Sequence, residues 1–207
     1  MESFFENLFS RIRVRRLYLN IDPLWGTASD DMEVERVCRA YLSDIVVRRP
    51  EKASFGGAVK WLWAQPETEW FLHLEDDWLL LRPIDPRRLL REMETPNVVQ
   101  ISLSRMNRKA WKKGVWLDLF TTSPSFLRSS FSKLVSSLQN PELDPEKQMS
   151  GGSNPELVAA IREKFRHRLH GSRFSRRYIA DIGRNWREAR KIEKKIIDGR
   201  SVWIVSD

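Results

Sequence analysis

Residues 70–78, with the sequence WFLHLEDDW, carry an apolar run directly into three consecutive carboxylates. The run 70–74 has the length and composition of a buried strand. In open α/β sheets, ligands bind beyond the carboxyl ends of the strands. Adjacent carboxylates repel one another, and a hard divalent cation offsets that repulsion because it takes oxygen ligands. The stretch therefore predicts a strand that ends in a cation site.

The three acids are Glu75, Asp76 and Asp77. Successive side chains of an extended chain point to opposite sides, so we expect Glu75 and Asp77 to face the same way and to share a cation. The alternative interpretation is a solvated turn between two strands. The flanking tryptophans disfavour that alternative, because acids bracketed by buried aromatic side chains are not plain surface.

Strand-like and helix-like segments alternate on either side of this stretch. Further strands are expected at 16–21, 44–48, 97–103, 114–121 and 202–205. Helices are expected at 2–10, after Asp30 or Asp31, after Ser54, after Ser123-Pro124, after Asn154-Pro155 and within 184–196, with a loop at 140–153. Such alternation predicts an α/β domain with a largely parallel sheet.

The chain has 207 residues, which predicts one domain over residues 1–207. No run approaches the roughly 20 apolar residues that span a bilayer. The first residues lack the basic region followed by an apolar stretch that marks a secretory signal. The one cysteine, Cys38, excludes an internal disulfide and a multi-cysteine zinc site. These features predict a cytoplasmic protein without a transmembrane segment.

Positive charge gathers in residues 161–200, which we call the basic C-terminal segment. It holds 14 Lys or Arg and 5 Asp or Glu, a net charge of +9, whereas the whole chain carries +8. Such a segment attracts the phosphates of nucleic acid, acidic lipid head groups or a nucleotide. The alternative interpretation is a solvated helix face.

The acidic stretch and its surroundings resemble a known family. A strand followed by (Asp/Glu)-X-Asp, after a helix, is the signature of the GT-A nucleotide-sugar glycosyltransferases. The preceding SFGGAVKW at 54–61 looks like the small-residue helix start of these enzymes. SPSFLR at 123–128, NPE at 154–156 and YIADIGRNW at 178–186 look like segments of a small bacterial and phage subgroup. The resemblance spans roughly residues 2–190.

The resemblance implies a fold and an activity. The fold is a mostly parallel, twisted sheet flanked by helices. The activity is transfer of a sugar from a UDP- or GDP-type nucleotide-diphosphate sugar to a carbohydrate or lipid-linked acceptor, with Mn²⁺ or Mg²⁺ bridging the motif and the diphosphate. The chain departs from the family at its start, where its first residues resemble the helix that follows the first strand. We therefore expect the first strand to be missing and the nucleobase pocket to be open on one side.

The resemblance also implies roles for single residues. Glu75 and Asp77 would hold the metal, with His170 and Asp181 as candidates for a further ligand near the C-terminus. The nucleotide and its diphosphate would be contacted by Asp22, Lys60, Asp76, Arg173 and Arg184. Acids on the acceptor side, Asp144 and Glu156, are candidates for the general base of an inverting transfer. Glu156 is explained equally well by the attraction of an acid to a helix N-terminus.

Two other functions remain open at this point. A glycosyltransferase-like protein could bind metal and nucleotide without transferring a sugar. A basic protein could instead bind nucleic acid through residues 161–200. No helix-turn-helix, zinc-finger or RNA-binding signature supports the nucleic-acid interpretation, and the acidic stretch disfavours it. Turnover of a nucleotide sugar in the presence of Mn²⁺ would separate an enzyme from a binding protein.

Overall fold

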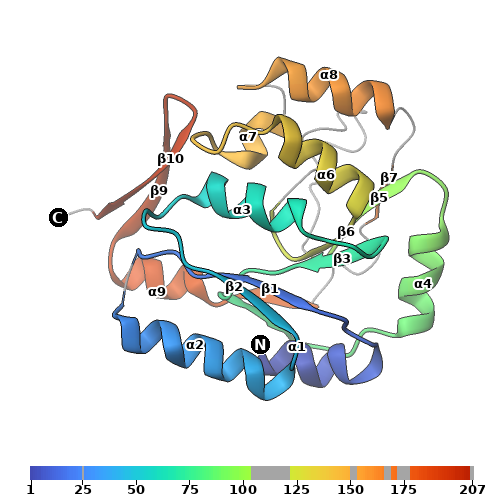
Figure 1. Ribbon diagram of the computed structural model, residues 1–207, viewed down its shortest axis with the longest axis horizontal. Coiled ribbons are helices and arrows are strands. Elements are labelled where there is room, and N and C mark those ends of the chain that lie inside the picture. The colour runs from blue at the N-terminus through green and yellow to red at the C-terminus, as the bar shows by residue number, and fades with distance from the viewer. Residues whose placement is uncertain (25, 104–121, 150–152, 166–168, 172–177, 206–207) are drawn as a thin grey trace.

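The computed structural model describes residues 1–24, 26–103, 122–149, 153–165, 169–171 and 178–205 (Figure 1). Its helices are α1 (Glu2–Asn7), η1 (a 3₁₀ turn, Phe9–Arg11), α2 (Ala28–Tyr41), α3 (Phe55–Ala64), α4 (Pro86–Glu94), α6 (Ser129–Leu138), α7 (Pro145–Met149), α8 (Pro155–Lys164) and α9 (Gly183–Ala189). Its strands are β1 (Leu17–Asn20), β2 (Ile45–Arg48), β3 (Trp70–His73), β4 (Trp78–Leu80), β5 (Val98–Ser102), β6 (Ser125–Arg128), β7 (Leu169–Gly171), β8 (Ile179–Asp181), β9 (Ile192–Ile197) and β10 (Arg200–Val205).

The largest sheet among the described residues has the strand order β3-β6-β5-β7. Strand β6 runs antiparallel to both β3 and β5, whereas β5 and β7 are parallel. A separate parallel pair joins β1 to β2, and β4 pairs antiparallel with β8. The α/β class is thus confirmed. The mostly parallel, twisted sheet is not confirmed, because β6 inserts between its neighbours in the opposite direction.

Strand β6 also corrects a prediction for residues 123–138. The helical spacing of Leu127 and Phe131 favoured one helix after Ser123-Pro124, but residues 125–128 are extended and helix α6 begins at Ser129. Phe126 and Leu127 are buried in two different apolar clusters, because adjacent side chains of a strand point to opposite faces. A short, fully buried apolar run has no periodicity that separates a strand from a helix.

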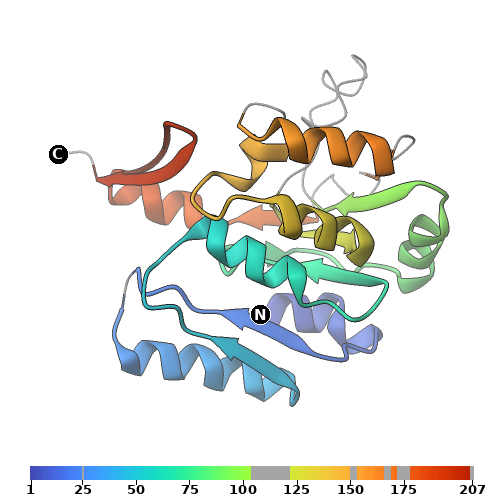
Figure 2. The same ribbon diagram turned by 45° about the horizontal axis from the view of Figure 1, so that its top comes forward.

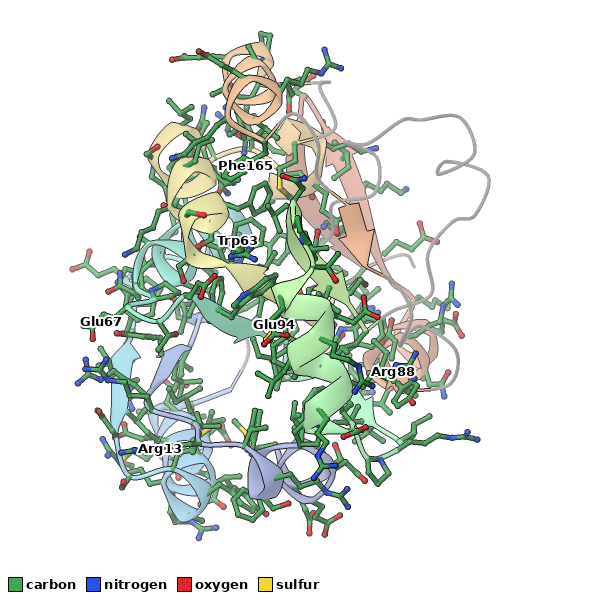
Figure 3. The ribbon with its side chains drawn as sticks, turned by 90° about the vertical axis from the view of Figure 1, so that its right-hand side faces the viewer. Arg13, Trp63, Glu67, Arg88, Glu94 and Phe165 are labelled. Atoms are coloured by element: carbon green, nitrogen blue, oxygen red, sulfur yellow. The ribbon has the colours of Figure 1, made fainter. Side chains whose placement is uncertain are left out.

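Helices cover both faces of this sheet (Figure 2). One apolar cluster joins α3, α6 and α8 to the sheet and is built around Trp63, Phe131 and Leu157. The other cluster joins α1 and α4 to the opposite face through Phe4 and Ile101, among others. Figure 3 shows Trp63 in the interior, whereas Arg13 and Glu67 lie toward the left-hand edge of that view.

The last described elements differ from their prediction as well. A helix was expected within 184–196, but α9 ends at Ala189 and residues 192–197 form strand β9. The backbone has positive φ at Lys191 (51°), which ends the helix, and at Asp198 (50°) and Gly199 (77°). An Asp-Gly pair with positive φ at both positions is the preferred tight turn of a hairpin, so β9 returns as β10.

The other predicted boundaries fare as follows. The helix expected at 2–10 is α1 followed by η1, and the loop expected at 140–153 contains α7. The helix expected after Asp30 or Asp31 begins earlier, at Ala28 (α2), because Thr27 is its N-cap and forms a capping box with Asp30. The strand expected at 114–121 lies outside the described residues. Among the helices that the structure describes, none is long and apolar enough to cross a membrane.

A cavity of about 580 Å³ lies between the β1-β2 pair and the four-stranded sheet. Leu17 and Tyr18 of β1 line it on one side and residues 70–74 on the other, so we call it the inter-sheet cavity. Within the described chain, β1 pairs with β2 alone and β3 with β6 alone. Residues 1–16 hold α1 and η1 and no strand.

Candidate functional site

The three acids lie between two strands. Strand β3 ends at His73 and β4 begins at Trp78, so residues 75–77, here called the acidic turn, connect them. The acids therefore lie in a turn at 76–77 and not on an extended strand, so the alternation of a strand does not apply to them. Asp76 is exposed, but Glu75 and Asp77 are half-buried, so the turn is not a plain solvated one either.

Glu75 is held against an aromatic side chain. The indole N–H of Trp78 donates a hydrogen bond to Glu75 Oε2 over 3.2 Å. Burial raises the pKa of Glu75 to about 7, and the nearby Asp77 and Glu146 act in the same direction. The Trp78 hydrogen bond and the charge of Lys194 lower that pKa but do not offset the burial. Glu75 is thus a carboxyl group whose ionised form lacks full compensation at neutral pH.

Asp77 is joined to a second acid by one guanidinium. Arg187 Nη1 lies 2.7 Å from Asp77 Oδ2, and Nη2 lies 3.0 Å from Asp181 Oδ2. The two acids meet because β4 and β8 pair with Trp78 opposite Asp181. The backbone N–H of Ile182 also donates to the carbonyl of Asp77 over 2.8 Å. Two carboxylates far apart in the sequence therefore share one cationic side chain.

The other carboxylate oxygen of Asp77 has no such partner. Asp77 Oδ1 is buried and accepts no hydrogen bond in the described part of the chain. Burial raises the pKa of Asp77, whereas the hydrogen bond from Arg187 lowers it. Buried polar atoms are normally satisfied, so an unpartnered carboxylate oxygen calls for a proton or a cation.

The predicted acceptor-side acids have structural partners or lie at the surface. Asp144 is buried, accepts from the backbone N–H of Lys147 at the start of α7, and lies 2.9 Å from Lys194 Nζ. These bonds place Asp144 in a helix cap and an ion pair. Glu156 is exposed in the first turn of α8, next to the capping residue Asn154. No contact recorded for the described residues brings Glu156 to the acidic turn.

Two predicted nucleotide contacts also serve local structure. Asp22 accepts from Asn20 Nδ2 over 2.9 Å and from the backbone N–H of Ser54 over 3.3 Å, so it links the end of β1 to the start of α3. Lys60 Nζ donates to the carbonyl of Gln139 over 2.7 Å, which ties α3 to the end of α6.

The remaining predicted residues come from the basic C-terminal segment. The backbone N–H of Arg184 donates to Asp181 Oδ1 over 2.8 Å, and its exposed guanidinium lies 3.4 Å from Glu188. His170 lies in β7 in register with Gln100, and its side chain is outside the described part of the structure. Arg173 lies outside the described residues.

Sequence reasoning missed Arg187 and Lys194, the cations that contact Asp77, Asp181 and Asp144. The only signal for them was the positive charge of residues 161–200, which pointed to a segment and not to single residues. Their partners could not be predicted, because they depend on how β8, α9 and β9 pack against the acidic turn.

The donor atoms at the turn suit a hard cation in part. The side chains of Glu75, Asp76 and Asp77 offer carboxylate oxygens as ligands, and Mg²⁺ and Mn²⁺ prefer oxygen ligands. Yet the described residues contain no group of three His, Cys, Asp or Glu side chains that could hold a metal. The predicted four-residue ligand set is thus not assembled by the described side chains. Mg²⁺ is commonly held by one or two carboxylates together with phosphates and waters, and the turn fits that arrangement.

Comparisons with known proteins give no further guide to this site. A scan against protein-family models, a search of curated proteins and a search of solved structures found no match. The resemblance to the GT-A family therefore rests on the residues of this chain alone.

Glu75→Gln is expected to change how stability depends on pH. Between about pH 4.5 and 7, Glu75 is protonated in the folded protein and ionised in the unfolded chain. The stability it contributes is present below pH 4.5 and is lost as the pH rises through 7, a loss of about 3 kcal/mol. Urea unfolding in EDTA should show that the variant gains up to that amount over the wild type between pH 5 and pH 8.

His73 makes the wild-type comparison necessary. Burial lowers the pKa of His73 to about 4, so its contribution to stability is lost as the pH falls below about 6.5. This slope opposes that of Glu75 over part of the range, and only the difference between variant and wild type isolates Glu75. A difference that stays constant from pH 5 to pH 8 would show that Glu75 titrates normally.

Proposed function

We propose that the protein is a metal-dependent glycosyltransferase, which transfers a sugar from a nucleotide-diphosphate sugar to a carbohydrate or lipid-linked acceptor. The observation that carries the proposal is the buried, unpartnered Oδ1 of Asp77 in a turn with two further acids. Arg187 occupies the other oxygen of Asp77 and leaves Oδ1 for a second cation. The proposed cofactor is Mn²⁺ or Mg²⁺, held by Asp77 and Glu75.

Glu75 supports the same assignment. A half-buried carboxyl with a pKa of about 7 is costly to ionise, and a cation beside it lowers that cost. A divalent ion between the turn and the diphosphate would neutralise charge on the leaving group. Neighbouring side chains hold the carboxylates in place: Trp78 orients Glu75, and Arg187 orients Asp77 and Asp181.

Cations near the turn suit an anionic donor. Arg184 is exposed in the first turn of α9, and Lys194 of β9 acts electrostatically on Glu75. We propose that Arg184 contacts the diphosphate, since guanidinium groups bind phosphate oxygens in a bidentate manner. Lys194 forms an ion pair with Asp144, so we propose that it adds positive electrostatic potential at the site without contacting the diphosphate.

A second candidate is binding of metal and nucleotide without transfer. The inter-sheet cavity favours it, because β1 with Asp22 on one side and β3 with the acidic turn on the other are not joined by hydrogen bonds in the described chain. A nucleobase pocket open on one side would discriminate poorly among bases, and binding would rest mainly on the metal and the phosphates.

Asp77→Asn is expected to abolish the stabilisation that Mn²⁺ with UDP or GDP gives to the wild type. A ligand at a hundred times its Kd stabilises by about 2.7 kcal/mol, or about 5–10 °C in Tm for a domain of this size. The variant should keep its secondary structure and lose this shift, because Oδ1 no longer carries charge. Thermal unfolding with and without EDTA gives the measurement.

Glu163→Gln is the matched control, since Glu163 is an exposed acid on α8, away from the acidic turn in sequence. It should retain the full metal-dependent shift. An unchanged shift in Asp77→Asn would contradict the proposed metal site. Release of UDP or GDP from nucleotide sugars by the wild type with Mn²⁺ then separates transfer from binding alone.

A further inference from the structure

Strand β1 has one edge that no described strand pairs with. The backbone N–H groups of Leu17 and Ile21 donate to the carbonyls of Asp44 and Arg48, on the side of β2. Backbone groups alternate along a strand, so those of Tyr18 and Asn20 point to the other edge. No strand of the described chain pairs with that edge. An edge of this kind is a template for a further strand.

Strand β3 presents a second such edge to the same space. The carbonyl of Glu69 accepts from the start of α6, so the backbone groups of Trp70, Leu72 and Leu74 point away from β6. The Trp70 carbonyl accepts from Thr68 Oγ1 over 2.7 Å. The described chain supplies no hydrogen-bond partner for the backbone N–H and C=O groups of Leu72 and Leu74, which point away from β6.

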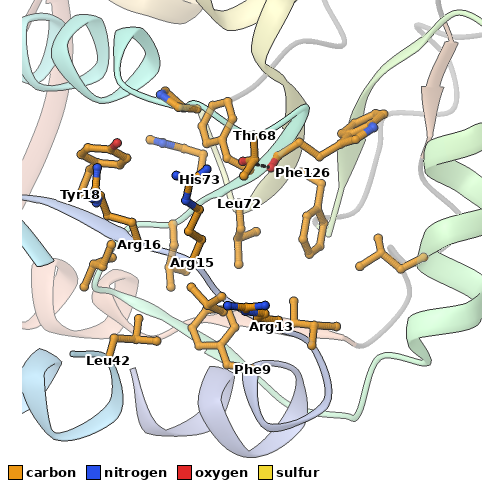
Figure 4. A pocket seen from close by; sticks show the side chains of 18 of the residues that line it. Phe9, Arg13, Arg15, Arg16, Tyr18, Leu42, Thr68, Leu72, His73 and Phe126 are labelled. Carbon is orange, nitrogen blue, oxygen red and sulfur yellow. Dashed lines mark hydrogen bonds between the residues drawn. The ribbon is translucent and has the colours of Figure 1, made fainter. Parts of the chain in front are cut away.

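The inter-sheet cavity lies between these two edges. Tyr18, Leu72 and Leu74 line it, so the unpaired backbone groups of both strands face one space of about 580 Å³. Its other walls are mostly apolar and include Phe9, Leu42 and Phe126. Figure 4 shows these side chains around the cavity, with Arg13 and Arg15 among them.

The cavity carries an excess of positive charge. Among the described residues that line it are four arginines and one acid, Glu67, with which Arg15 and Arg16 pair, each over 3.5 Å. Arg11 and Arg13 are exposed and make no ion pair among the described residues. Two guanidinium groups beside an apolar cavity are thus left for an acidic partner.

We propose that the inter-sheet cavity binds an extended segment of a partner protein as an added strand. The segment is apolar at its centre, pairs through its backbone with β1 and β3, and carries acidic residues that meet Arg11 and Arg13. Backbone hydrogen bonds supply affinity in this mode of recognition, and pockets for the side chains supply specificity. The unpaired edges on both sides favour a peptide over a lipid or fatty acid, which would satisfy the arginines but not the backbone. The proposal is independent of any nucleotide-sugar activity.

The test uses fluorescent peptides of about eight residues, with a β-branched apolar centre flanked by aspartate or glutamate. Acidic-flanked peptides are expected to bind, and peptides with lysine flanks to bind about tenfold more weakly. The double variant Arg11→Glu, Arg13→Glu should reverse that order. Arg82→Glu is the control, since Arg82 is an exposed arginine that does not line the cavity.

Amide hydrogen exchange locates the bound peptide. Binding should slow exchange at Tyr18, Asn20, Leu72 and Leu74, and a peptide N-methylated at alternate residues should neither bind nor protect them. Failure of every acidic-flanked peptide to protect these amides would overturn the proposal. Two other results would also overturn it. In one, dodecyl phosphate displaces the peptide and binds without protecting these amides. In the other, a dimer of the chain protects these amides in the absence of peptide.

Discussion

Trp63→Ala is expected to lower the free energy of unfolding by about 3–5 kcal/mol, the range for removing a large aromatic side chain from a core. Trp63 is fully buried, and its ring centroid lies 6.2 Å from that of Phe131. Its indole N–H donates to His73 Nδ1 over 3.2 Å. Truncation therefore leaves a cavity and also leaves a buried histidine nitrogen without a donor. Urea unfolding at pH 7 gives the measurement.

Two variants separate these contributions. Trp63→Phe keeps much of the volume but loses the donor to His73, so we expect a loss of about 1–3 kcal/mol. Trp61→Ala is the control on the same helix, because Trp61 is only half-buried beside Arg48, and we expect a clearly smaller loss. Equal losses for Trp61→Ala and Trp63→Ala would contradict the central position given to Trp63.

Gly56→Ala is expected to destabilise the protein by about 3 kcal/mol, at the upper end for an overpacked core. In an ordinary helix the same change would stabilise by up to about 1 kcal/mol. Here an added Cβ would collide with the carbonyl oxygen of Pro141 and would lie 2.7 Å from that of Leu143. Both atoms belong to backbone, which cannot rotate away as a side-chain end can.

Residues 139–143 are also hydrogen-bonded to α3 and its N-cap. Ser54 Oγ donates to the Pro141 carbonyl over 3.1 Å, and Gln139 Nε2 donates to the Gly56 carbonyl over 3.1 Å. Gly57→Ala is the matched control, because its Cβ would meet the Ser54 side chain, with Oγ at 2.9 Å. Thermal unfolding should show a small change for Gly57→Ala and a large loss for Gly56→Ala. A Gly56→Ala protein as stable as the wild type would mean that the segment moves freely.

Local patterns predicted those elements whose sequence signals do not depend on a neighbour. Ser54 and Asn154 cap α3 and α8 as expected, with their side-chain oxygens accepting from Gly57 and Leu157. The runs 44–48 and 70–74 form β2 and β3 to within one residue at each end. Capping and β-branched or aromatic runs act within a few residues, so a single sequence reveals them.

Part of the candidate site was also visible in the sequence. Three adjacent carboxylates after an apolar strand marked the acidic turn, and Asp77 lies close enough to Glu75 and to Asp181 to affect the pKa of the one and to be affected by the other. The argument from strand alternation does not explain this arrangement, because β3 ends at His73 and the acids lie in the turn that follows.

What the sequence by itself determined is the α/β class, the capped starts of α3 and α8, and the three acids that follow β3. Only the tertiary structure decided the strand order, the direction of β6, the pairing of Asp77 and Asp181 through Arg187, and the space between β1 and β3. The physical reason is range: caps and apolar runs are set by neighbours along the chain. Strand pairing and ion pairs are set by which surfaces pack together, and many pairings suit the same local pattern.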